Sequence, residues 1–305
     1  MSTVQTPFAS DPAQEVYFES GPYQLFGKLR IVSREAPTLL LLHGLGFHSF
    51  EYDPLASLLA QGAINSFAFD YRCHGRSSGP RGRWVLHELV DDADKATEFL
   101  CGKVEGDIGV FGNSLGAIAG LYLAARNPLV KSLVASGCPT RVADFAITPT
   151  KKALLGFLQT LAIVVPLRIS VNHFIPYKKI LQDPRIIQLV RRDKRISDAR
   201  RFAPATYADM FRWNALDVID QVKVPLLILY GIRDRLQPAE QSAMLFESAR
   251  PPKEMHALDT GHVPNLENPD LINPILRGWF GKTLSPGCRD GAPPEAVQQA
   301  VRDLP

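Results

Sequence analysis

A serine flanked by two glycines is the first candidate for chemistry in this 305-residue chain. Ser114 lies in the run VFGNSLGAI, with Gly112 and Gly116 two positions away on either side. The run follows an apolar stretch and opens a helical pattern, so small residues at both positions would let a strand turn sharply into a helix and expose the hydroxyl. An ordinary strand-to-helix turn has the same spacing, but the context favours a nucleophile.

A serine hydroxyl needs a general base, and the sequence offers one late in the chain. His262 follows the last predicted strand, and Asp234 follows the strand before it. Because the carboxyl ends of parallel strands meet at one edge of a sheet, both are expected near Ser114. His262 would remove the hydroxyl proton, and Asp234 would orient the imidazole unless it only caps a turn. Asp259 is a rival acid, but it shares a loop with His262.

Backbone N–H groups for a developing oxyanion are expected at two positions. Leu115 follows the serine at the start of a helix, where the dipole and the free N–H groups favour negative charge. Leu45 lies in the run HGLG after an apolar stretch and would supply the second donor, although a glycine-rich loop without a ligand remains an alternative. A further polar loop is interpreted as structural, with side chains that bond neighbouring loops: Asp70, Arg72 and His74.

Strand and helix patterns alternate along most of the chain and must position these residues. Two runs near the N-terminus, 15–20 and 23–32, predict an antiparallel pair. Apolar runs typical of buried parallel strands lie at 38–44, 64–72, 107–114, 131–137, 225–234 and 254–262. Helical patterns lie at 53–61, 86–101, 116–127, 239–249 and 273–280. This order predicts an α/β fold with a doubly wound, mostly parallel, eight-stranded sheet.

The alternation fails in one long insertion before the last two predicted parallel strands. Residues 151–201 hold twelve Lys or Arg against three Asp, a net charge of +9 in a chain whose total is +3. Such a shift in composition predicts a separate helical cap, and the Pro- and Gly-rich end predicts a loosely docked tail. The predicted parts are a core of 1–138 and 203–283, a cap of 139–202 and a tail of 284–305.

Composition excludes several classes of protein. The small net charge does not indicate a nucleic-acid binder, and the N-terminus lacks the basic and apolar pattern of a secretory signal. The cysteines show neither zinc-site spacing nor a disulfide framework, which favours reduced thiols and a cytoplasmic protein: Cys73, Cys101, Cys138 and Cys288. The apolar run 153–171 predicts a buried or interfacial helix because polar or helix-breaking residues interrupt it: Gln159, Pro166 and Arg168.

Together these motifs resemble the α/β-hydrolase superfamily over roughly residues 15–283, apart from the cap. The runs HGLGFHSFEYDPLASLLA, DYRCHGRSSGPRG and GHVPNLENP resemble its monoacylglycerol lipase and lysophospholipase branch. The resemblance implies a serine esterase that hydrolyses fatty acyl esters through an acyl-enzyme, beneath a helical cap, with no metal or other cofactor. It also implies the roles of five residues, namely the triad Ser114, Asp234 and His262 and the oxyanion donors Leu45 and Leu115.

One departure from that branch keeps two alternatives open. Asn113 precedes the serine where the branch more often has His, and the run GNS is similar to hydrolases that cleave carbon–carbon bonds in ring-fission products. Those hydrolases usually place a Trp soon after the catalytic His, whereas Val263 and Pro264 follow His262 here. The alternatives are a carbon–carbon bond hydrolase with the same triad and a non-catalytic ligand receptor on the same fold.

The predicted cap suggests what the protein could contact. Its apolar first half could line an acyl pocket, and its cationic runs RRDKR (191–195) and ARR (199–201) could attract an anionic head group or membrane surface. A solvated basic surface is the alternative. The expected partner is therefore a small-molecule acyl ester, without nucleic acid, whereas acyl length, head group and oligomeric state stay open.

Overall fold

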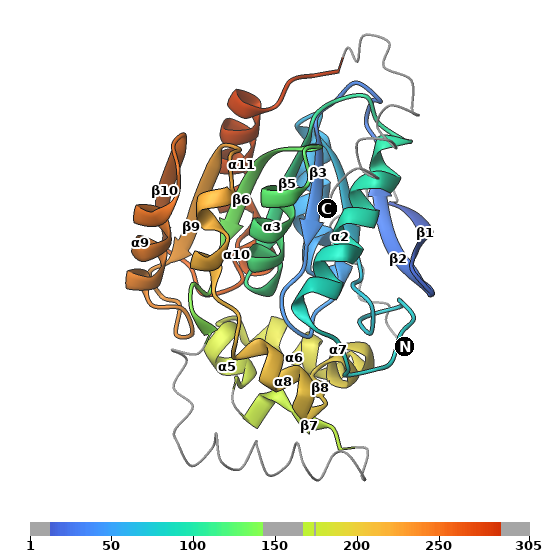
Figure 1. Ribbon diagram of the computed structural model, residues 1–305, viewed down its shortest axis with the longest axis vertical. Coiled ribbons are helices and arrows are strands. Elements are labelled where there is room, and N and C mark those ends of the chain that lie inside the picture. Colours follow the sequence, from blue (N-terminus) through green and yellow to red (C-terminus); the bar gives the residue numbers. More distant parts are fainter. Residues whose placement is uncertain (1–12, 143–166, 174, 288–305) are drawn as a thin grey trace.

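An eight-stranded sheet forms the centre of the computed structural model, which describes residues 13–142, 167–173 and 175–287 (Figure 1). In spatial order its strands are β1 (Gln14–Ser20), β2 (Tyr23–Arg30), β4 (Asn65–Phe69), β3 (Thr38–Leu42), β5 (Ile108–Asn113), β6 (Val130–Ser136), β9 (Leu226–Gly231) and β10 (Lys253–Leu258). β1 pairs antiparallel with β2, and β2 antiparallel with β4. All other neighbours pair in parallel, which confirms the predicted eight-stranded, mostly parallel sheet.

Helices cover both faces of the sheet because its central strands are apolar on both sides. In β3, Leu40 and Leu42 pack into one core and Leu39 and Leu41 into the other, as the alternation of side chains along a strand requires. The first core is closed by helices α2 (Leu86–Cys101), α3 (Leu115–Arg126) and α9 (Ala239–Ser248). The second core is closed by α1 (Asp53–Gln61) and α11 (Pro269–Thr283). The sheet is therefore doubly wound.

The predicted element boundaries are most accurate for the helices. Helices α1 and α2 have the predicted bounds, whereas α11 begins four residues before its predicted start at 273 and accommodates Pro274. The predicted parallel strands extend too far at their carboxyl ends. The run 225–234, for example, is a strand only over Leu226–Gly231. At this edge the chain leaves the sheet, so polar residues there belong to loops.

Short elements fill the described part of the insertion and the segment that follows it. They are β7 (Ile169–Ser170), η3 (Val171–His173), α5 (Tyr177–Ile180), α6 (Pro184–Arg192), α7 (Lys194–Ala199), β8 (Arg201–Phe202), α8 (Pro204–Met210), η4 (Ala215–Asp217) and η5 (Ile219–Gln221). Much of the predicted helix 153–171 lies outside the described residues. Its end is wrong, because Ile169 pairs with Phe202 in an antiparallel ribbon. No helix in the described part of the chain is both long and apolar enough to cross a membrane.

The elements of this insertion cover the carboxyl edge of the sheet (Figure 1). A third apolar cluster joins insertion side chains to loops after β3 and β10: Phe47, Tyr177, Ile180, Leu181, Val190, Ile196, Val263 and Leu266. A polar contact reinforces it, since His48 Nε2 lies 3.0 Å from Asp193 Oδ2 between α6 and α7. The division into a core and a cap at residues 139 and 202 stays a prediction.

The start of the predicted tail packs against the core. Leu284 is buried beside α11, and the Ser285 N–H donates to Asp107 Oδ2 at 2.8 Å. Residues 288–305, which include Cys288, lie outside the described residues. The first residue of the predicted tail, Leu284, is therefore well packed. For the rest of the tail, loose docking stays a prediction.

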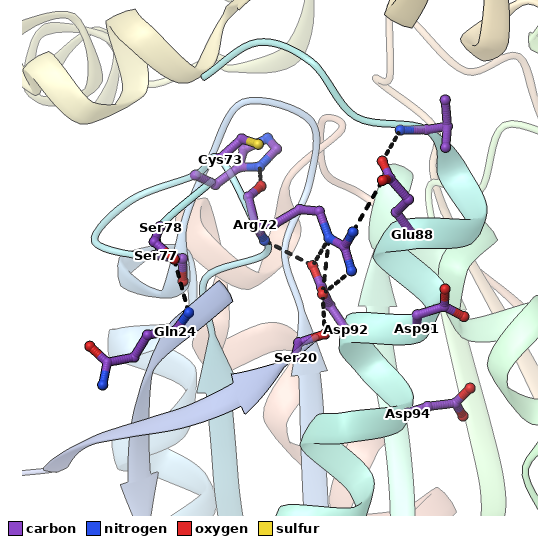
Figure 2. Close-up of polar contacts among 12 residues, drawn as sticks. Ser20, Gln24, Arg72, Cys73, Ser77, Ser78, Glu88, Asp91, Asp92 and Asp94 are labelled. Atoms are coloured by element: carbon purple, nitrogen blue, oxygen red, sulfur yellow. Dashed lines mark hydrogen bonds and ion pairs between the residues drawn. The ribbon is translucent and has the colours of Figure 1, made fainter. Parts of the chain in front are cut away.

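A buried ion pair ties the loop after β4 to α2 (Figure 2). Arg72 Nη2 lies 2.7 Å from Asp92 Oδ1, and the Arg72 N–H donates to Asp92 Oδ2 at 2.9 Å. Ser20 of β1 donates to the same carboxylate at 2.6 Å, and Glu88 lies 3.2 Å from Arg72 Nη1. Contacts with neighbouring segments agree with the structural interpretation of Asp70 and Arg72, since Asp70 accepts the Ser49 N–H and Arg72 bonds Asp92. His74, by contrast, bonds the Arg72 carbonyl within its own loop.

Candidate active site

Ser114 occupies a strained turn between β5 and α3. Its φ and ψ are 55° and −115°, a conformation that costs a residue with a side chain about 1–3 kcal/mol. The flanking glycines make the turn sterically feasible. A Cβ on Gly116 would lie 1.9 Å from the Leu42 carbonyl oxygen, and one on Gly112 would lie 2.2 Å from the Gly116 carbonyl oxygen. The GxSxG motif is thus a packing requirement at this crossing of strand and helix.

Asp234 and His262 meet beyond the carboxyl ends of β9 and β10. Asp234 Oδ2 lies 2.6 Å from His262 Nδ1, and both side chains are almost fully buried. The other carboxylate oxygen accepts the N–H groups of Leu236 at 2.7 Å and Gln237 at 3.0 Å. Burial raises the pKa of Asp234, but His262 and the two N–H groups outweigh it, so the pKa lies below its usual value. The ionised carboxylate can therefore hold the imidazole.

The rival acid, Asp259, lies away from the imidazole. Its side chain is 72% exposed and pairs with Arg233 Nε at 2.9 Å. The structure therefore brings Asp234, and not Asp259, to His262.

Two small cavities, each of about 40 Å³, share Ser114, His262 and Leu45 in their walls. The first cavity is also lined by Gly44, Phe47, Asn113, Ile175, Ile180, Arg200, Leu236 and Val263. The second cavity is also lined by Leu115, Pro139, Val142, Ile175, Met210, Trp213 and Leu236. His262 Nε2 is buried and has no hydrogen-bond partner among the described residues. The imidazole thus has an uncommitted nitrogen in a residue that borders the same cavities as the serine.

Glu51, which sequence analysis missed, anchors the loop that carries Leu45. Its carboxylate is fully buried and accepts the Gly44 N–H at 2.9 Å and the Asn265 side-chain amide at 2.8 Å. It therefore links the loop after β3 to α10 (Pro264–Glu267), which follows His262. Burial raises the pKa of Glu51 to about 7, against those two hydrogen bonds. In the sequence, the only signal is an acidic residue directly before an apolar helical pattern.

His43 fixes the same loop from its other end. The ring is fully buried, its Nε2 accepts the Tyr71 N–H at 3.1 Å, and its Nδ1 lies 2.9 Å from the Gly44 carbonyl oxygen. Since Nε2 accepts, Nδ1 carries the proton and donates. Burial lowers the pKa of His43 to about 3, so the ring is neutral near pH 7 and acts as a structural bridge.

One charged residue lies where the sequence did not place it. Arg200 was expected on the cationic outer face of the cap, together with the run RRDKR. The structure corrects this expectation, because Arg200 is only 1% exposed and lines the first cavity. Arg191 and Arg192, by contrast, are exposed as expected. A run of arginines gives no signal of which one turns inward, because that depends on the loops packed above it.

Comparisons with known proteins identify a family and several relatives of this chain. The family model described as serine aminopeptidase, S33 matches residues 34–262. Monoacylglycerol lipase from Mycolicibacterium smegmatis is 26% identical over 223 residues, which covers 68% of this chain and 74% of that protein. Monoglyceride lipase from Mus musculus is 25% identical over 273 residues, which covers 84% of this chain and 86% of that protein.

Other relatives are longer, and the solved structures support the fold. The chain spans only 22% and 48% of two α/β-hydrolase-domain proteins, from Dictyostelium discoideum (24% identical) and Arabidopsis thaliana (25% identical). The crystal structure of Paleococcus ferrophilus monoacylglycerol lipase has a TM-score of 0.68 at 24% identity, covering 83% of this chain and 98% of that one. The match to the family model spans most of the chain, and the chain therefore belongs to the serine aminopeptidase S33 family (Hydrolase_4) of α/β hydrolases.

Proposed function

We propose that this protein is a serine hydrolase that cleaves carboxylic esters. The observation that carries the proposal is the Asp234–His262 hydrogen bond beside cavities that Ser114 also lines. The strained turn at Ser114 supports it, since residues in strained backbone conformations cluster at active sites. The ester hydrolases among the relatives support it further.

In the proposed mechanism Ser114 attacks the ester carbonyl while His262 Nε2 accepts the hydroxyl proton. Asp234 stabilises the imidazolium that forms, and the N–H groups of Leu45 and Leu115 bind the oxyanion. The imidazolium then gives its proton to the leaving alcohol, which departs and leaves an acyl-enzyme. Water, deprotonated by His262, attacks the acyl-enzyme, and the acid is released as Ser114 regains its proton.

For the substrate we propose an acyl ester with an apolar chain, of the monoacylglycerol or lysophospholipid type. The second cavity supports an apolar chain, because its lining beyond Ser114 and His262 consists of apolar residues such as Val142, Met210 and Trp213. Burying a methylene group there would contribute about 0.8 kcal/mol. The names of the two lipase relatives, monoacylglycerol lipase and monoglyceride lipase, indicate the same substrate type.

Labelling with a fluorophosphonate probe tests the nucleophile. The wild-type protein is expected to react and to hydrolyse nitrophenyl esters, whereas Ser114→Ala should lose the label and on the order of 10³-fold or more of the rate. Ser197→Ala, an exposed serine of α7, serves as the matched control and should label normally. Labelling that survives in Ser114→Ala would exclude this serine as the nucleophile.

A panel of substrates distinguishes the alternatives. Esters of increasing chain length should be hydrolysed faster than aminoacyl amides, the class that the family description suggests. Turnover of a ring-fission product without ester turnover would favour carbon–carbon cleavage. Asn113 keeps that alternative relevant, since its Oδ1 is buried without a hydrogen-bond partner among the described residues. Ligand binding with neither labelling nor turnover would favour a receptor.

We also propose peripheral contact with anionic membranes through the exposed cations of α6 and α7. Arg191, Arg192 and Lys194 are exposed, and the structure gives them no ion pair within the described residues. Each Lys or Arg near an anionic surface contributes about 1 kcal/mol to binding. Contact through this face would bring the covered carboxyl edge of the sheet close to lipid substrates.

A further inference from the structure

Arg200 is a buried guanidinium, and its hydrogen-bond partners among the described residues are all neutral. Its Nε donates to Asn172 Oδ1 at 2.8 Å, Nη1 to the Leu45 carbonyl at 3.3 Å and Nη2 to the Ile175 carbonyl at 2.6 Å. The ring of Tyr177 lies 4.6 Å from the guanidinium carbon. A guanidinium has five N–H bonds, so these three contacts leave two N–H donors without a partner among the described residues.

The charge of Arg200 has no counter-ion in residues 13–142, 167–173 and 175–287. No carboxylate of these residues lies within ion-pair distance of the guanidinium, and the side chain is 1% exposed, so water gives little compensation. Burial lowers the pKa of Arg200 to about 10, which still leaves the group charged at neutral pH. Buried charges in proteins are normally paired, so a lone cation calls for a negative partner from elsewhere.

The cavity that Arg200 lines also contains the proposed nucleophile and base. Ser114 and His262 form part of its wall, and Phe47, Ile180 and Val263 supply apolar surface around them. The second cavity, on which Ser114 also borders, contains no arginine. The two cavities beside the serine therefore differ, since an arginine lines only the first.

We propose that Arg200 binds a carboxylate of the substrate, so that the preferred ester carries this anionic group a few bonds from its scissile carbonyl. The apolar chain of the same ester occupies the second cavity. This inference rests on the proposed ester hydrolase function, and it makes an ester with a carboxylate, rather than a neutral monoacylglycerol, the preferred substrate. Arg200 and Ser114 line the same cavity of about 40 Å³, so the carboxylate and the reacting carbon are expected to lie close together.

A carboxylate fits this position better than a larger anion. It is planar and small, and the parallel N–H bonds of a guanidinium match its two oxygens. A phosphate monoester needs more room than a carboxylate in the same cavity. The hexanoyl ester of glycolic acid is a suitable probe, because its carboxylate is two bonds from the ester oxygen. The hexanoyl ester of glycolamide has nearly the same shape without the charge.

The rival explanation gives Arg200 a purely structural role. Its stem packs against Gly46, where an added Cβ would lie 2.3 Å from Arg200 Cγ, and it donates to the Leu45 carbonyl. A residue that only holds this loop would influence all esters alike. The ratio of kcat/KM for the glycolate ester to that for the glycolamide ester separates the two roles, because loop geometry affects both esters and charge recognition only one.

The kinetic test compares this ratio in the wild type and three variants. The wild type should prefer the glycolate ester on the order of tenfold or more, and Arg200→Met should reduce the ratio to near one. Arg200→Lys keeps the stem and the charge, so it should retain part of the preference for the glycolate ester. It replaces Arg200→Met in the test if that variant folds poorly. Arg201→Met, the exposed neighbour in β8, is the matched control and should keep the wild-type ratio. A wild-type ratio near one, or a ratio unchanged in Arg200→Met, overturns the proposal.

A binding measurement separates this inference from the proposed function. Calorimetry with Ser114→Ala, in which turnover is blocked, should show tighter binding of the glycolate ester than of the glycolamide ester. That result supports the anionic subsite even if the wild type fails to hydrolyse either ester, which would refute only the esterase. Equal affinities, in a protein whose wild type labels at Ser114 and hydrolyses the neutral ester, would refute the subsite and leave the esterase standing.

Discussion

Arg72 and Arg200 are both buried arginines, but within the described part of the chain only Arg72 has carboxylate partners. Arg72 lies between β4 and α2, with Asp92 on one side and Glu88 on the other (Figure 2). Asp92 outweighs the effect of burial and raises the pKa of Arg72 above its usual value. Among the residues that the structure describes, the polar partners of the Arg200 guanidinium are amide and carbonyl oxygens, with an aromatic ring beside it. Burial lowers the pKa of Arg200 to about 10.

The difference indicates two uses of the same side chain. The Arg72 guanidinium and its carboxylates form a closed set, so its hydrogen bonds fix a loop to a helix and leave little capacity for a ligand. The Arg200 guanidinium, which lines a cavity, has two N–H donors and a charge that no group in residues 13–142, 167–173 and 175–287 compensates. A buried charge that the fold leaves unbalanced is a candidate for ligand recognition, whereas a balanced one contributes to structure.

The comparison of Arg72 with Arg200 assumes that the cavity beside Arg200 is the reaction site. The prediction with the largest expected effect, a loss of kcat, tests this assumption. Asp234→Asn should lower kcat for a neutral ester on the order of 10³- to 10⁴-fold, because the imidazole loses the carboxylate that fixes its tautomer. Asp259→Asn, which removes the exposed rival acid, should retain activity close to that of the wild type. Equal losses in the two variants, with circular dichroism spectra unchanged, would contradict the assignment.

Removing the partner of Arg72 sharpens the comparison from the structural side. Asp92→Asn should lower the free energy of unfolding by about 3–5 kcal/mol, because it leaves the guanidinium of Arg72 without its closest counter-ion. Asp91→Asn, the half-exposed neighbour on α2, should change it by no more than about 0.5 kcal/mol. Urea titrations measure both values. A small loss of unfolding free energy in Asp92→Asn would mean that Asp92 compensates little of the Arg72 charge. The contrast with Arg200 would then disappear.

Glu51 extends the comparison to a buried charge that titrates near neutral pH. Its pKa in the folded protein, about 7, lies above the ordinary value of 4.5, so the folded state binds the proton more tightly. The resulting stabilisation is complete below pH 4.5 and is lost as pH rises through 7, by roughly 1 kcal/mol per pH unit. The unfolding free energy of the wild type should therefore fall relative to that of Glu51→Gln across this interval. Parallel curves in urea titrations would show that the fold stabilises the charged carboxylate fully.

The smallest effect concerns the arginines that stay on the surface. Arg191→Gln combined with Arg192→Gln should weaken binding to phosphatidylserine-containing vesicles by about 1 kcal/mol per removed cation and reduce its salt dependence. Arg126→Gln, on the distant helix α3, is the control. Sedimentation that depends neither on anionic lipid nor on salt would leave the exposed cations as a merely solvated surface, distinct from the functional cation proposed at Arg200.

The sequence alone predicted the sheet and the order of the proposed site residues, for local reasons. Apolar runs and helical periodicity identified most strands and helices of the core because burial on both faces of a parallel sheet leaves a strong pattern. The glycines around Ser114 were informative because only glycine fits where strand, helix and the Leu42 carbonyl cross. The positions of Asp234 and His262 followed from the rule that parallel strands end at one edge.

Only the tertiary structure decided which polar groups are buried and what they contact. Glu51 joins loops more than 200 residues apart, since its partner Asn265 lies 214 positions away. The sequence run ARR predicts an exposed Arg200. In the structure this side chain is buried, because the loop after β3 and the segment around Tyr177 pack over it. The burial of a charge depends on contacts between distant segments, and a one-dimensional pattern carries no record of those contacts.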